Sequence, residues 1–275
     1  MNNSPTPFKY AYWIKEIGKC LGKGQTRDAL FCINKAIESA QTDTERAEAL
    51  NFMGSSLFEL ERYEEALSVY EEVLKAYRDK EEKEEEPFLK EHVAKAFFGQ
   101  IFVLSKLERE AEAASLCDSF VSKFGGEEKN QFIRKQVIKA LLQKGAYFAK
   151  LGQQEQGIAS YGLTIYDDVI RRCGTEVSFN LFIAEALIKK GELLSKLNRK
   201  EEALSLYDEI VHRFGNETDL KLKQKVAEAL YLKAFALFGL KRYKEALSNF
   251  ISTYGNTEEL SLKRKTALAL LLKRK

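Results

Sequence analysis

The chain has 275 residues, of which 31% are charged and 45% hydrophobic, with a formal net charge of +3. So small a net charge does not by itself argue for nucleic acid as a partner, and no stretch approaches the ~18 apolar residues of a membrane span. The N-terminal sequence MNNSPTPFKY lacks the apolar run of a signal peptide. We therefore expect a cytoplasmic protein without a membrane partner.

The four cysteines, Cys20, Cys32, Cys117 and Cys173, form no CxxC pair and fall within helical patterns. Such cysteines usually serve as small buried apolar side chains, and free thiols fit the reducing cytoplasm. The alternative is a disulfide between Cys20 and Cys32 in the first pair of helices.

Residues 1–7 are polar and include two prolines, so we expect a loosely ordered N-terminus. After them the hydrophobic spacing is helical, most clearly between residues 44 and 78. Gly54 lies on one apolar stripe there, and Ala66 and Tyr70 lie on a second stripe after a polar turn. Because a small residue on each helix allows close packing, the segment is predicted to be a pair of packed helices.

This arrangement recurs along the chain. The small residue of each second helix is placed at Ala29, Ala66, Ala113, Gly157, Ala203 and Ala246. Twelve residues earlier, several copies carry another small residue, at Gly54, Gly145, Gly191 and Ala234. Four residues after the first set, an aromatic residue stands at Tyr70, Tyr161, Tyr207 and Phe250.

The recurring small and aromatic residues resemble the tetratricopeptide repeat (TPR) family, in a variant with repeats of about 43–47 residues in place of 34. The resemblance implies an all-α fold: a right-handed α-α superhelix, or solenoid, of about six helix pairs plus a C-terminal helix. We expect one solenoid over residues 8–275, with repeats at 8–40, 44–78, 87–125, 129–174, 176–215 and 217–255 and a terminal helix at 257–275.

Two features of the longer repeats carry structural predictions. Glycine follows several second helices, at Gly125, Gly174 and Gly215 among others, which predicts left-handed C-caps. In the fourth repeat, the segment from Gly157 to Cys173 is five residues longer than the segment from Ala203 to Phe214. Because five is not a multiple of 3.6, the second helix there must lengthen and rotate its stripe, or bulge.

Residues for chemistry are sparse. The histidines are His92 and His212, and the sequence has no HExxH, Walker A or GxGxxG motif. Paired glutamates, such as Glu64-Glu65, precede second helices, where acidic residues stabilise the helix dipole. We therefore expect no enzymatic activity, no metal and no cofactor.

The resemblance to the TPR family also implies a concave groove, lined by the first helices, that binds a peptide or a helix of a partner protein. By helical geometry, the residues beside the packing stripe face that groove. They are predicted to be Asn51, Phe58, Lys95, Phe98, Phe102, Leu142, Ile188, Tyr231, Phe235 and Phe238. Contiguous apolar residues on an open surface indicate a partner, whereas the alternative is that the longer first helices bury them.

Chaperone-binding members of the family hold a C-terminal carboxylate with Lys, Asn and Arg on successive first helices. In this sequence Asn51 and Lys95 are isolated matches, while Ile14 and Gly18 occupy places of the clamp in the first repeat. Because the clamp is incomplete, we do not predict binding of a chaperone tail.

The sequence therefore predicts a non-catalytic scaffold that binds a protein or peptide. The alternative is a regulatory or sensor region of a longer protein whose catalytic or DNA-binding part lies outside this chain. The predicted terminal helix has no partner helix and carries Leu268, Leu271 and Leu272, so docking on another molecule or self-association through this helix stays open. Its basic residues could contact nucleic acid, but a solvated helix face is the simpler interpretation.

Overall fold

The computed structural model describes residues 8–77, 88–126, 129–151, 156–246 and 248. Helices and short turns make up this described part, which contains no strand, so the predicted all-α repeat fold is confirmed. The chain divides into two compact units, residues 1–143 and 144–275, and each unit is described by itself. The predicted N-terminal segment 1–7 and terminal helix 257–275 lie outside the described residues, and one solenoid over 8–275 stays a prediction.

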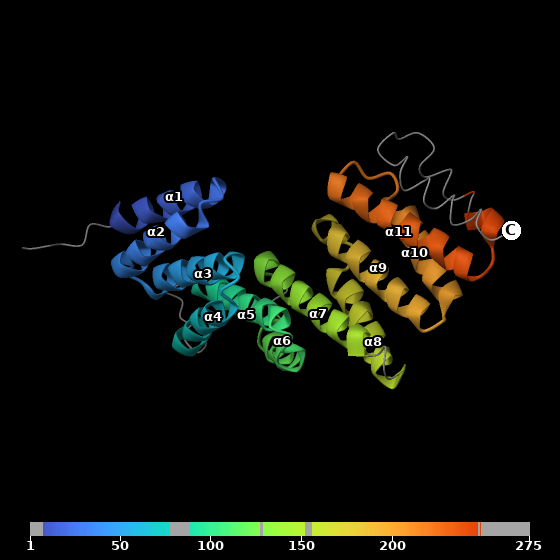
Figure 1. Ribbon diagram of the computed structural model, residues 1–275, viewed down its shortest axis with the longest axis horizontal. Coiled ribbons are helices and arrows are strands. Elements are labelled where there is room, and N and C mark those ends of the chain that lie inside the picture. The colour runs from blue at the N-terminus through green and yellow to red at the C-terminus, as the bar shows by residue number, and fades with distance from the viewer. Residues whose placement is uncertain (1–7, 78–87, 127–128, 152–155, 247, 249–275) are drawn as a thin grey trace, which may run out of the picture. The chain divides into compact units, whose positions relative to one another are not determined.

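The N-terminal unit consists of successive helix pairs (Figure 1). Its helices are α1 (Phe8–Gly22), α2 (Thr26–Ser39), α3 (Asp43–Glu59), α4 (Tyr63–Tyr77), α5 (Leu89–Lys106), α6 (Glu110–Phe124) and the first part of α7 (Gln131–Leu151). Helices α1 and α2, α3 and α4, and α5 and α6 pack as pairs, and α5 also packs on both α3 and α4. Each pair therefore rests on the pair before it, as expected of a helical repeat.

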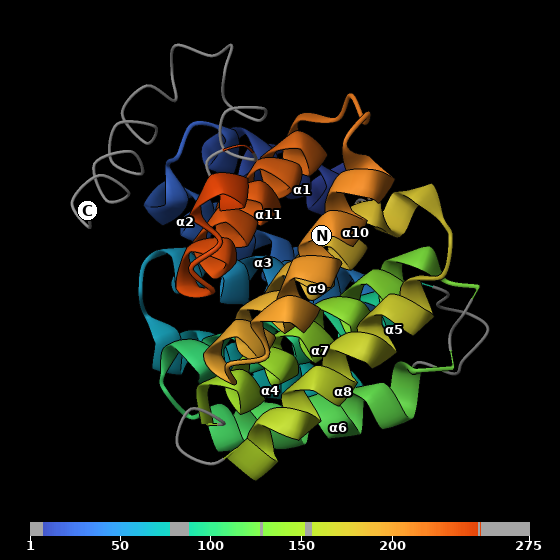
Figure 2. The same ribbon diagram turned by 90° about the vertical axis from the view of Figure 1, so that its right-hand side faces the viewer.

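The C-terminal unit repeats this arrangement (Figure 2). It contains the end of α7, then α8 (Gln156–Cys173), the 3-10 turn η1 (Val177–Phe179), α9 (Asn180–Lys196), α10 (Lys200–Phe214) and α11 (Leu220–Gly239). Helix α9 packs on α8 and α10, and α11 packs on α10 and α9. A further helical turn begins at Tyr243 and includes the buried Ala246.

A buried tyrosine on each glycine-bearing pair fixes how closely the helices approach. A Cβ atom on Gly54 would lie 2.6 Å from the Tyr70 ring, and one on Gly99 of the following first helix would lie 2.4 Å from it. Tyr207 lies in the same way on Gly191, at 2.6 Å. Burial raises the pKa of Tyr70 and Tyr207 to about 12. The small residues predicted from the sequence are therefore the sites where these rings pack.

The fourth repeat has a different register from the predicted one. The ring that packs on Gly145 is Tyr166, 2.7 Å from the position of a Cβ atom, and Tyr166 is fully buried. Tyr161, predicted for this place, is 65% exposed. The prediction was wrong because it assumed a constant spacing of twelve residues between the small residues of the two helices.

Gly162 takes the place that the sequence pattern gave to Gly157. It lies four residues before Tyr166, as Ala203 lies before Tyr207, and a Cβ atom on it would approach the α7 backbone to 3.5 Å at Ala149 N. The five extra residues therefore precede Gly162, near the α7–α8 turn. Helix α8 takes up three of them, because it has 18 residues compared with 15 in α10, and it runs without a bulge.

The turns within the helix pairs share one backbone conformation. A residue with a left-handed φ of 58–69° precedes the second helix at Gly24, Glu61, Glu108, Asn198 and Lys241. In four of these turns an arginine follows and pairs with a glutamate three residues later, as Arg62 pairs with Glu65 at 2.6 Å. The arginine holds the pKa of that glutamate below its usual value. The glutamates at the starts of second helices thus act through an ion pair as well as the helix dipole.

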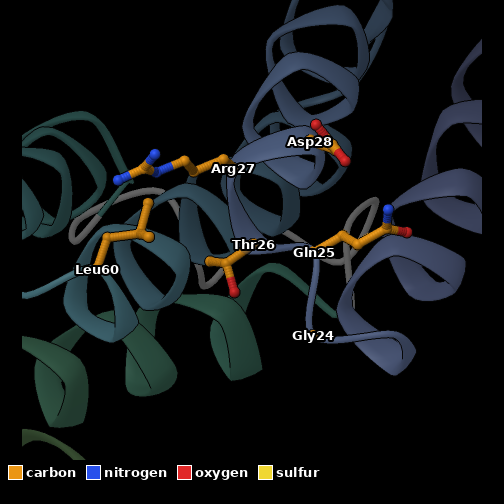
Figure 3. Close-up of a pocket in the computed structure, with 6 residues that line it drawn as sticks. All are labelled: Gly24, Gln25, Thr26, Arg27, Asp28 and Leu60. Atoms are coloured by element: carbon orange, nitrogen blue, oxygen red, sulfur yellow. The ribbon is translucent and has the colours of Figure 1, made fainter.

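A hollow of about 300 Å³ lies beside the first of these turns (Figure 3). It is lined by Gly24, Gln25, Thr26, Arg27, Asp28 and Leu60. Arg27 and Asp28 point to opposite sides, so the charged groups do not converge on a common point. We assign no ligand to this hollow.

The glycines after the second helices only partly follow the prediction of left-handed C-caps. Gly174 has a left-handed φ of +61°, as predicted. Gly125 and Gly215 have right-handed φ values of −65° and −60°, so the prediction was wrong at both. At Gly215 the constraint is space, because a Cβ atom would lie 2.5 Å from Val211 O.

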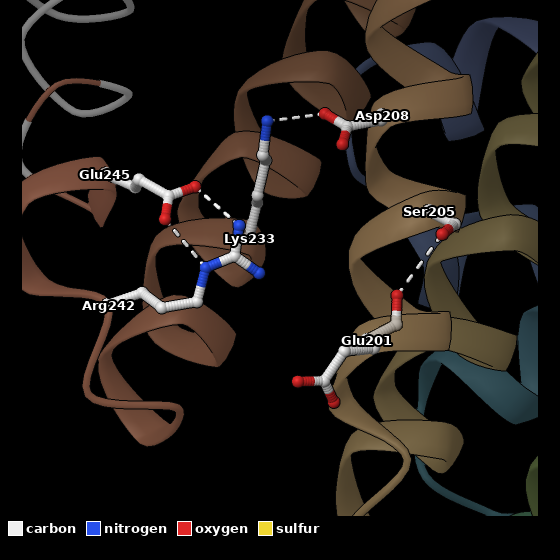
Figure 4. A network of polar contacts seen from close by, with 6 residues as sticks. All are labelled: Glu201, Ser205, Asp208, Lys233, Arg242 and Glu245. Carbon is white, nitrogen blue, oxygen red and sulfur yellow. Dashed lines mark hydrogen bonds and ion pairs between the residues drawn. The ribbon is translucent and has the colours of Figure 1, made fainter.

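Polar contacts between neighbouring repeats support the corrected register. Lys190 of α9 pairs with Asp167 of α8, and Lys233 of α11 pairs with Asp208 of α10 (Figure 4). Each aspartate directly follows a buried tyrosine, Tyr166 or Tyr207. The matching contact in the N-terminal unit joins Gln100 to Glu71, which follows Tyr70, at 3.4 Å. Because such partly exposed contacts contribute little, on the order of 1 kcal/mol or less, they mark the repeat register more than they stabilise it.

The cysteines are free thiols. Cys117 and Cys173 are buried, as predicted, whereas Cys20 and Cys32 are half-buried beside the core of the first helix pair. Burial, with a further contribution from neighbouring Cys20, raises the pKa of the Cys32 thiol. The alternative of a Cys20–Cys32 disulfide is therefore not the state of this structure.

Candidate peptide-binding face

Helix α5 of the N-terminal unit presents one stripe of aromatic and basic residues. Lys95, Phe98, Phe102 and Lys106 recur at spacings of three and four, which places them on one side of the helix. The first three are half-buried and Lys106 is exposed. The stripe therefore lies at the boundary between the packed core and solvent.

On this stripe, Phe102 contacts an aromatic ring of α3, and Phe98 contacts Phe102. The ring centroids of Phe98 and Phe102 are 6.2 Å apart and the rings are stacked, and those of Phe102 and Phe58 are 5.0 Å apart. Phe58 in turn packs on Tyr63 at 5.3 Å. The structure thus brings Phe58, Phe98 and Phe102 into one aromatic row, and contacts of this kind contribute about 0.5–1.5 kcal/mol each beyond area burial.

Lysines lie over these rings. The Lys95 ammonium is 5.1 Å from the centroid of Phe52, and the Lys139 ammonium of α7 is 5.4 Å from that of Phe98. Burial lowers the pKa of Lys95, although nearby Glu48 opposes the shift. Burial, and then the charge of Lys135, lowers the pKa of Lys139. We call this surface, made of Phe52, Phe58, Lys95, Phe98, Phe102 and Lys139, the Phe–Lys face.

Hydrogen bonds hold the first helices beneath this face. The hydroxyl of Tyr10 of α1 lies 2.8 Å from both Glu45 O and Glu48 Oε2 of α3, which share its one hydrogen as acceptors. Asn51 Nδ2 of α3 donates to Ala47 O at 2.9 Å and to His92 O of α5 at 3.0 Å. The backbone and carboxylate acceptors on α3 and α5 therefore fix α1, α3 and α5 relative to one another.

Three predicted groove residues are buried. Asn51 and Ile188 are 0% exposed and Leu142 is 8% exposed. Their predicted role is corrected, because side chains enclosed by their own and neighbouring helices offer no surface to a partner. Asn51 joins two first helices in place of contacting a ligand.

The remaining predicted residues, Tyr231, Phe235 and Phe238, lie on α11 of the C-terminal unit. Tyr231 and Phe235 are 51% and 69% exposed and are separated by one helical turn. Phe238 packs edge-on against Tyr243, with ring centroids 5.3 Å apart. These residues form a small aromatic surface of the C-terminal unit, and it is treated separately from the Phe–Lys face.

Phe52 and Lys139 complete the Phe–Lys face; helical geometry also predicts that Lys139 points to the groove, whereas Phe52 was absent from the predicted set. Phe52 directly follows Asn51, and its role becomes clear only when Lys95 of the next repeat is placed over its ring. Lys139 has the position on α7 that Lys95 has on α5. A search for lysine and phenylalanine at matched positions of neighbouring first helices would have found Phe52.

The described residues show no cluster of metal-binding side chains. They contain no group of three or more His, Cys, Asp or Glu side chains that could hold a metal ion. His92 of α5 is half-buried and His212 of α10 is exposed, on different units. None of the described helices has the length and apolar composition needed to cross a membrane.

Comparison with known families identifies the repeat. Profiles for the tetratricopeptide repeat match residues 47–80 and residues 188–252. The chain belongs to the TPR family. The matched ranges contain the TPR packing pairs Gly54–Tyr70 and Gly191–Tyr207, whereas the fourth repeat, with its shifted register, lies outside both.

Solved structures show the same TPR fold. A tetratricopeptide repeat protein from Parabacteroides merdae is 12% identical, with a TM-score of 0.61 over 97% of this chain and 91% of that one. NprR in complex with its cognate peptide NprX is 14% identical, with a TM-score of 0.51 over 98% of this chain and 74% of that one. A search of curated protein sequences gave no match. At such low identities the likeness establishes the TPR fold alone.

Proposed function

We propose that this TPR protein is a non-catalytic scaffold that binds a segment of a partner protein on the Phe–Lys face of its N-terminal unit. TPR folds generally mediate protein–protein interactions. The observation that carries the proposal is the row of half-buried rings, Phe58, Phe102 and Phe98, on neighbouring first helices. A contiguous apolar surface of this kind is typical of a contact with a partner.

Two further points support this proposal. The likeness to the structure of NprR spans 98% of this chain and 74% of that one, and that protein is in complex with its cognate peptide. The hydrogen bonds of Tyr10 and Asn51 join the helices below the Phe–Lys face, so the surface exists before a partner arrives. A preformed surface loses less conformational entropy on binding.

Tyr231 and Phe235 are a second contact surface under the same proposal. Their exposure on α11 makes them available to a partner segment. The alternative to a scaffold, a regulatory or sensor region of a longer protein, stays a prediction. The cytoplasmic location also stays a prediction.

The test is a selection of short random peptides that bind the immobilised whole chain. We expect the enriched peptides to lose at least ~10-fold in affinity for the Phe98→Ser/Phe102→Ser variant, because removing two central rings of a contact typically costs more than ~1.4 kcal/mol. The matched control is Phe31→Ser, which removes an exposed aromatic ring on the second helix α2.

Two measurements keep the result interpretable. Thermal melting shows whether each variant is folded, and hydrogen exchange of the unmodified chain maps the bound peptide. Protection of α3 and α5 amides is expected. Enriched peptides that protect other helices and bind the double variant normally would overturn the proposal, as would the absence of any enriched peptide.

A further inference from the structure

The lysines of the Phe–Lys face differ from many basic side chains of the chain in what they contact. Arg62, Arg199, Lys190 and Lys233 each pair with a carboxylate. Within the described residues, Lys95, Lys139 and the neighbouring Lys106 form no ion pair, and each lies over a phenylalanine ring at 5.1–6.0 Å. In the part of the chain that the structure describes, these cations therefore lie on aromatic rings without an ion-paired carboxylate.

Two of these ammonium groups are also partly removed from water. Burial is the main cause of the lowered pKa of both Lys95 and Lys139. Glu48 is the carboxylate that acts on Lys95, and the group that acts on Lys139 is another cation, Lys135. A desolvated cation that lacks a close anion is destabilising, so an arriving carboxylate would find its counter-charge already positioned.

We propose that the segment bound on the Phe–Lys face is acidic and amphipathic. Its apolar side chains contact Phe58, Phe98 and Phe102, and its carboxylates pair with Lys95 on one side and Lys139 on the other. This inference rests on the proposed function and adds the chemistry of the partner. Charge complementarity of this kind sets the specificity and the association rate of an interface.

A nucleic acid is the other anion that lysines and aromatic rings could bind, but the geometry favours a protein. Binding of single-stranded nucleic acid uses open ring faces on which bases stack. Here Lys139 lies over Phe98, Lys106 lies over Phe102, and the two rings stack on each other. Few ring faces are left open, whereas ring edges and ammonium groups remain available to apolar side chains and carboxylates.

The experiment uses the peptides enriched on the whole chain, sequenced and then synthesised for titration. We expect aspartate or glutamate next to leucine, isoleucine or phenylalanine, and an affinity that falls as added salt shortens the Debye length. The Lys95→Met/Lys139→Met variant should bind these peptides at least ~10-fold more weakly, as expected when a partly buried charge pair is lost. An oligouridylate of similar length is titrated alongside and is expected to bind more weakly than the peptides.

The matched control is Lys35→Met/Lys123→Met. These lysines also lie over phenylalanine rings, Phe31 at 6.0 Å and Phe124 at 5.9 Å, but on the second helices α2 and α6. This control should leave the affinity within about twofold, because it removes the same number of charges away from the Phe–Lys face.

The possible results separate this inference from the proposed function. Enriched peptides that need Phe98 and Phe102 but are neutral or basic overturn the inference and leave the proposed function standing. Equal losses in the two lysine variants, or tighter binding of the oligouridylate, also overturn it. Peptides indifferent to Phe98 and Phe102 overturn both proposals.

Discussion

Two sets of aromatic residues in the N-terminal unit behave in opposite ways. Tyr70 is buried against Gly54 and Gly99, at distances that leave no room for a Cβ atom. Phe98 and Phe102 are half-buried, and Phe98 lies under the Lys139 ammonium. The aromatic ring alone therefore does not distinguish the two sets; a glycine beneath the ring indicates packing, and the lysine above Phe98 belongs to the surface that we propose binds a partner.

The comparison of buried with exposed aromatic residues can be tested most sharply at Tyr166 and Tyr161. The sequence pattern predicts Tyr161 on Gly145, whereas the structure has Tyr166 there. We expect Tyr166→Ala to destabilise the chain by about 3–5 kcal/mol, as for other large aromatic residues removed from a core. Tyr161→Ala should change stability by less than ~0.5 kcal/mol because that side chain is mostly exposed. Urea denaturation followed by circular dichroism measures both, and similar midpoints for the two variants would contradict the corrected register.

The next largest effect is expected from filling the space beneath a tyrosine. Gly99→Ala places a methyl group 2.4 Å from the Tyr70 ring, and overpacking of this kind typically destabilises by about 1–3 kcal/mol. Gly18→Ala is the control: it lies within α1 with no atom near the new methyl group, and it should stabilise by up to ~1 kcal/mol. Differences in the urea midpoint of opposite sign are expected. A stabilised Gly99→Ala would show that the ring moves aside freely.

The smallest effect concerns pH at His92, one turn from Lys95 on α5. Burial lowers the pKa of His92, with Glu48 and Glu91 opposing the shift and Lys95 adding to it, and Nδ1 has no hydrogen-bond partner. Above the unfolded pKa of ~6.5 the histidine is neutral in both states and contributes nothing. As the pH falls below that value, the unfolded chain takes up the proton first, so the stability decreases until the folded state is protonated as well.

The measurement is the urea midpoint between about pH 7.5 and 5.5, above the range in which ordinary carboxylates titrate. His92→Gln should remove the part of the decrease that comes from this side chain. Identical pH slopes for the unmodified chain and the variant would mean that His92 is protonated as easily in the folded state as in the unfolded one.

The helix pairs and their glycine–tyrosine contacts could be predicted because they depend on spacing within about one repeat. Gly54 and Tyr70, or Gly191 and Tyr207, meet across a single short turn. The prediction failed at Tyr161 because the five extra residues lengthen the fourth repeat equally whether they lie near the turn before the second helix or at the end of that helix. The spacing of the sequence cannot separate these two cases.

The candidate site was less predictable because it depends on contacts between repeats. Asn51 and Ile188 have the helical phase expected of a groove residue, but the packing of neighbouring helices buries them. Phe52 and Lys139 join the surface through partners more than 40 residues away, as the contact of Phe52 with Lys95 shows. Helical phase gives the direction of a side chain, whereas the neighbouring repeat decides whether it reaches solvent.

The contact of Tyr70 with two glycines has a consequence for exchanging parts of this protein. The Tyr70 ring packs on glycines of both the second and the third repeat, so neither repeat contains the whole contact. A transplanted repeat that lacked either glycine would meet the same ring in a space too small for it. The effects of changing Gly54 and Gly99 should therefore not add, and the portable module is the pair of hairpins with the tyrosine between them.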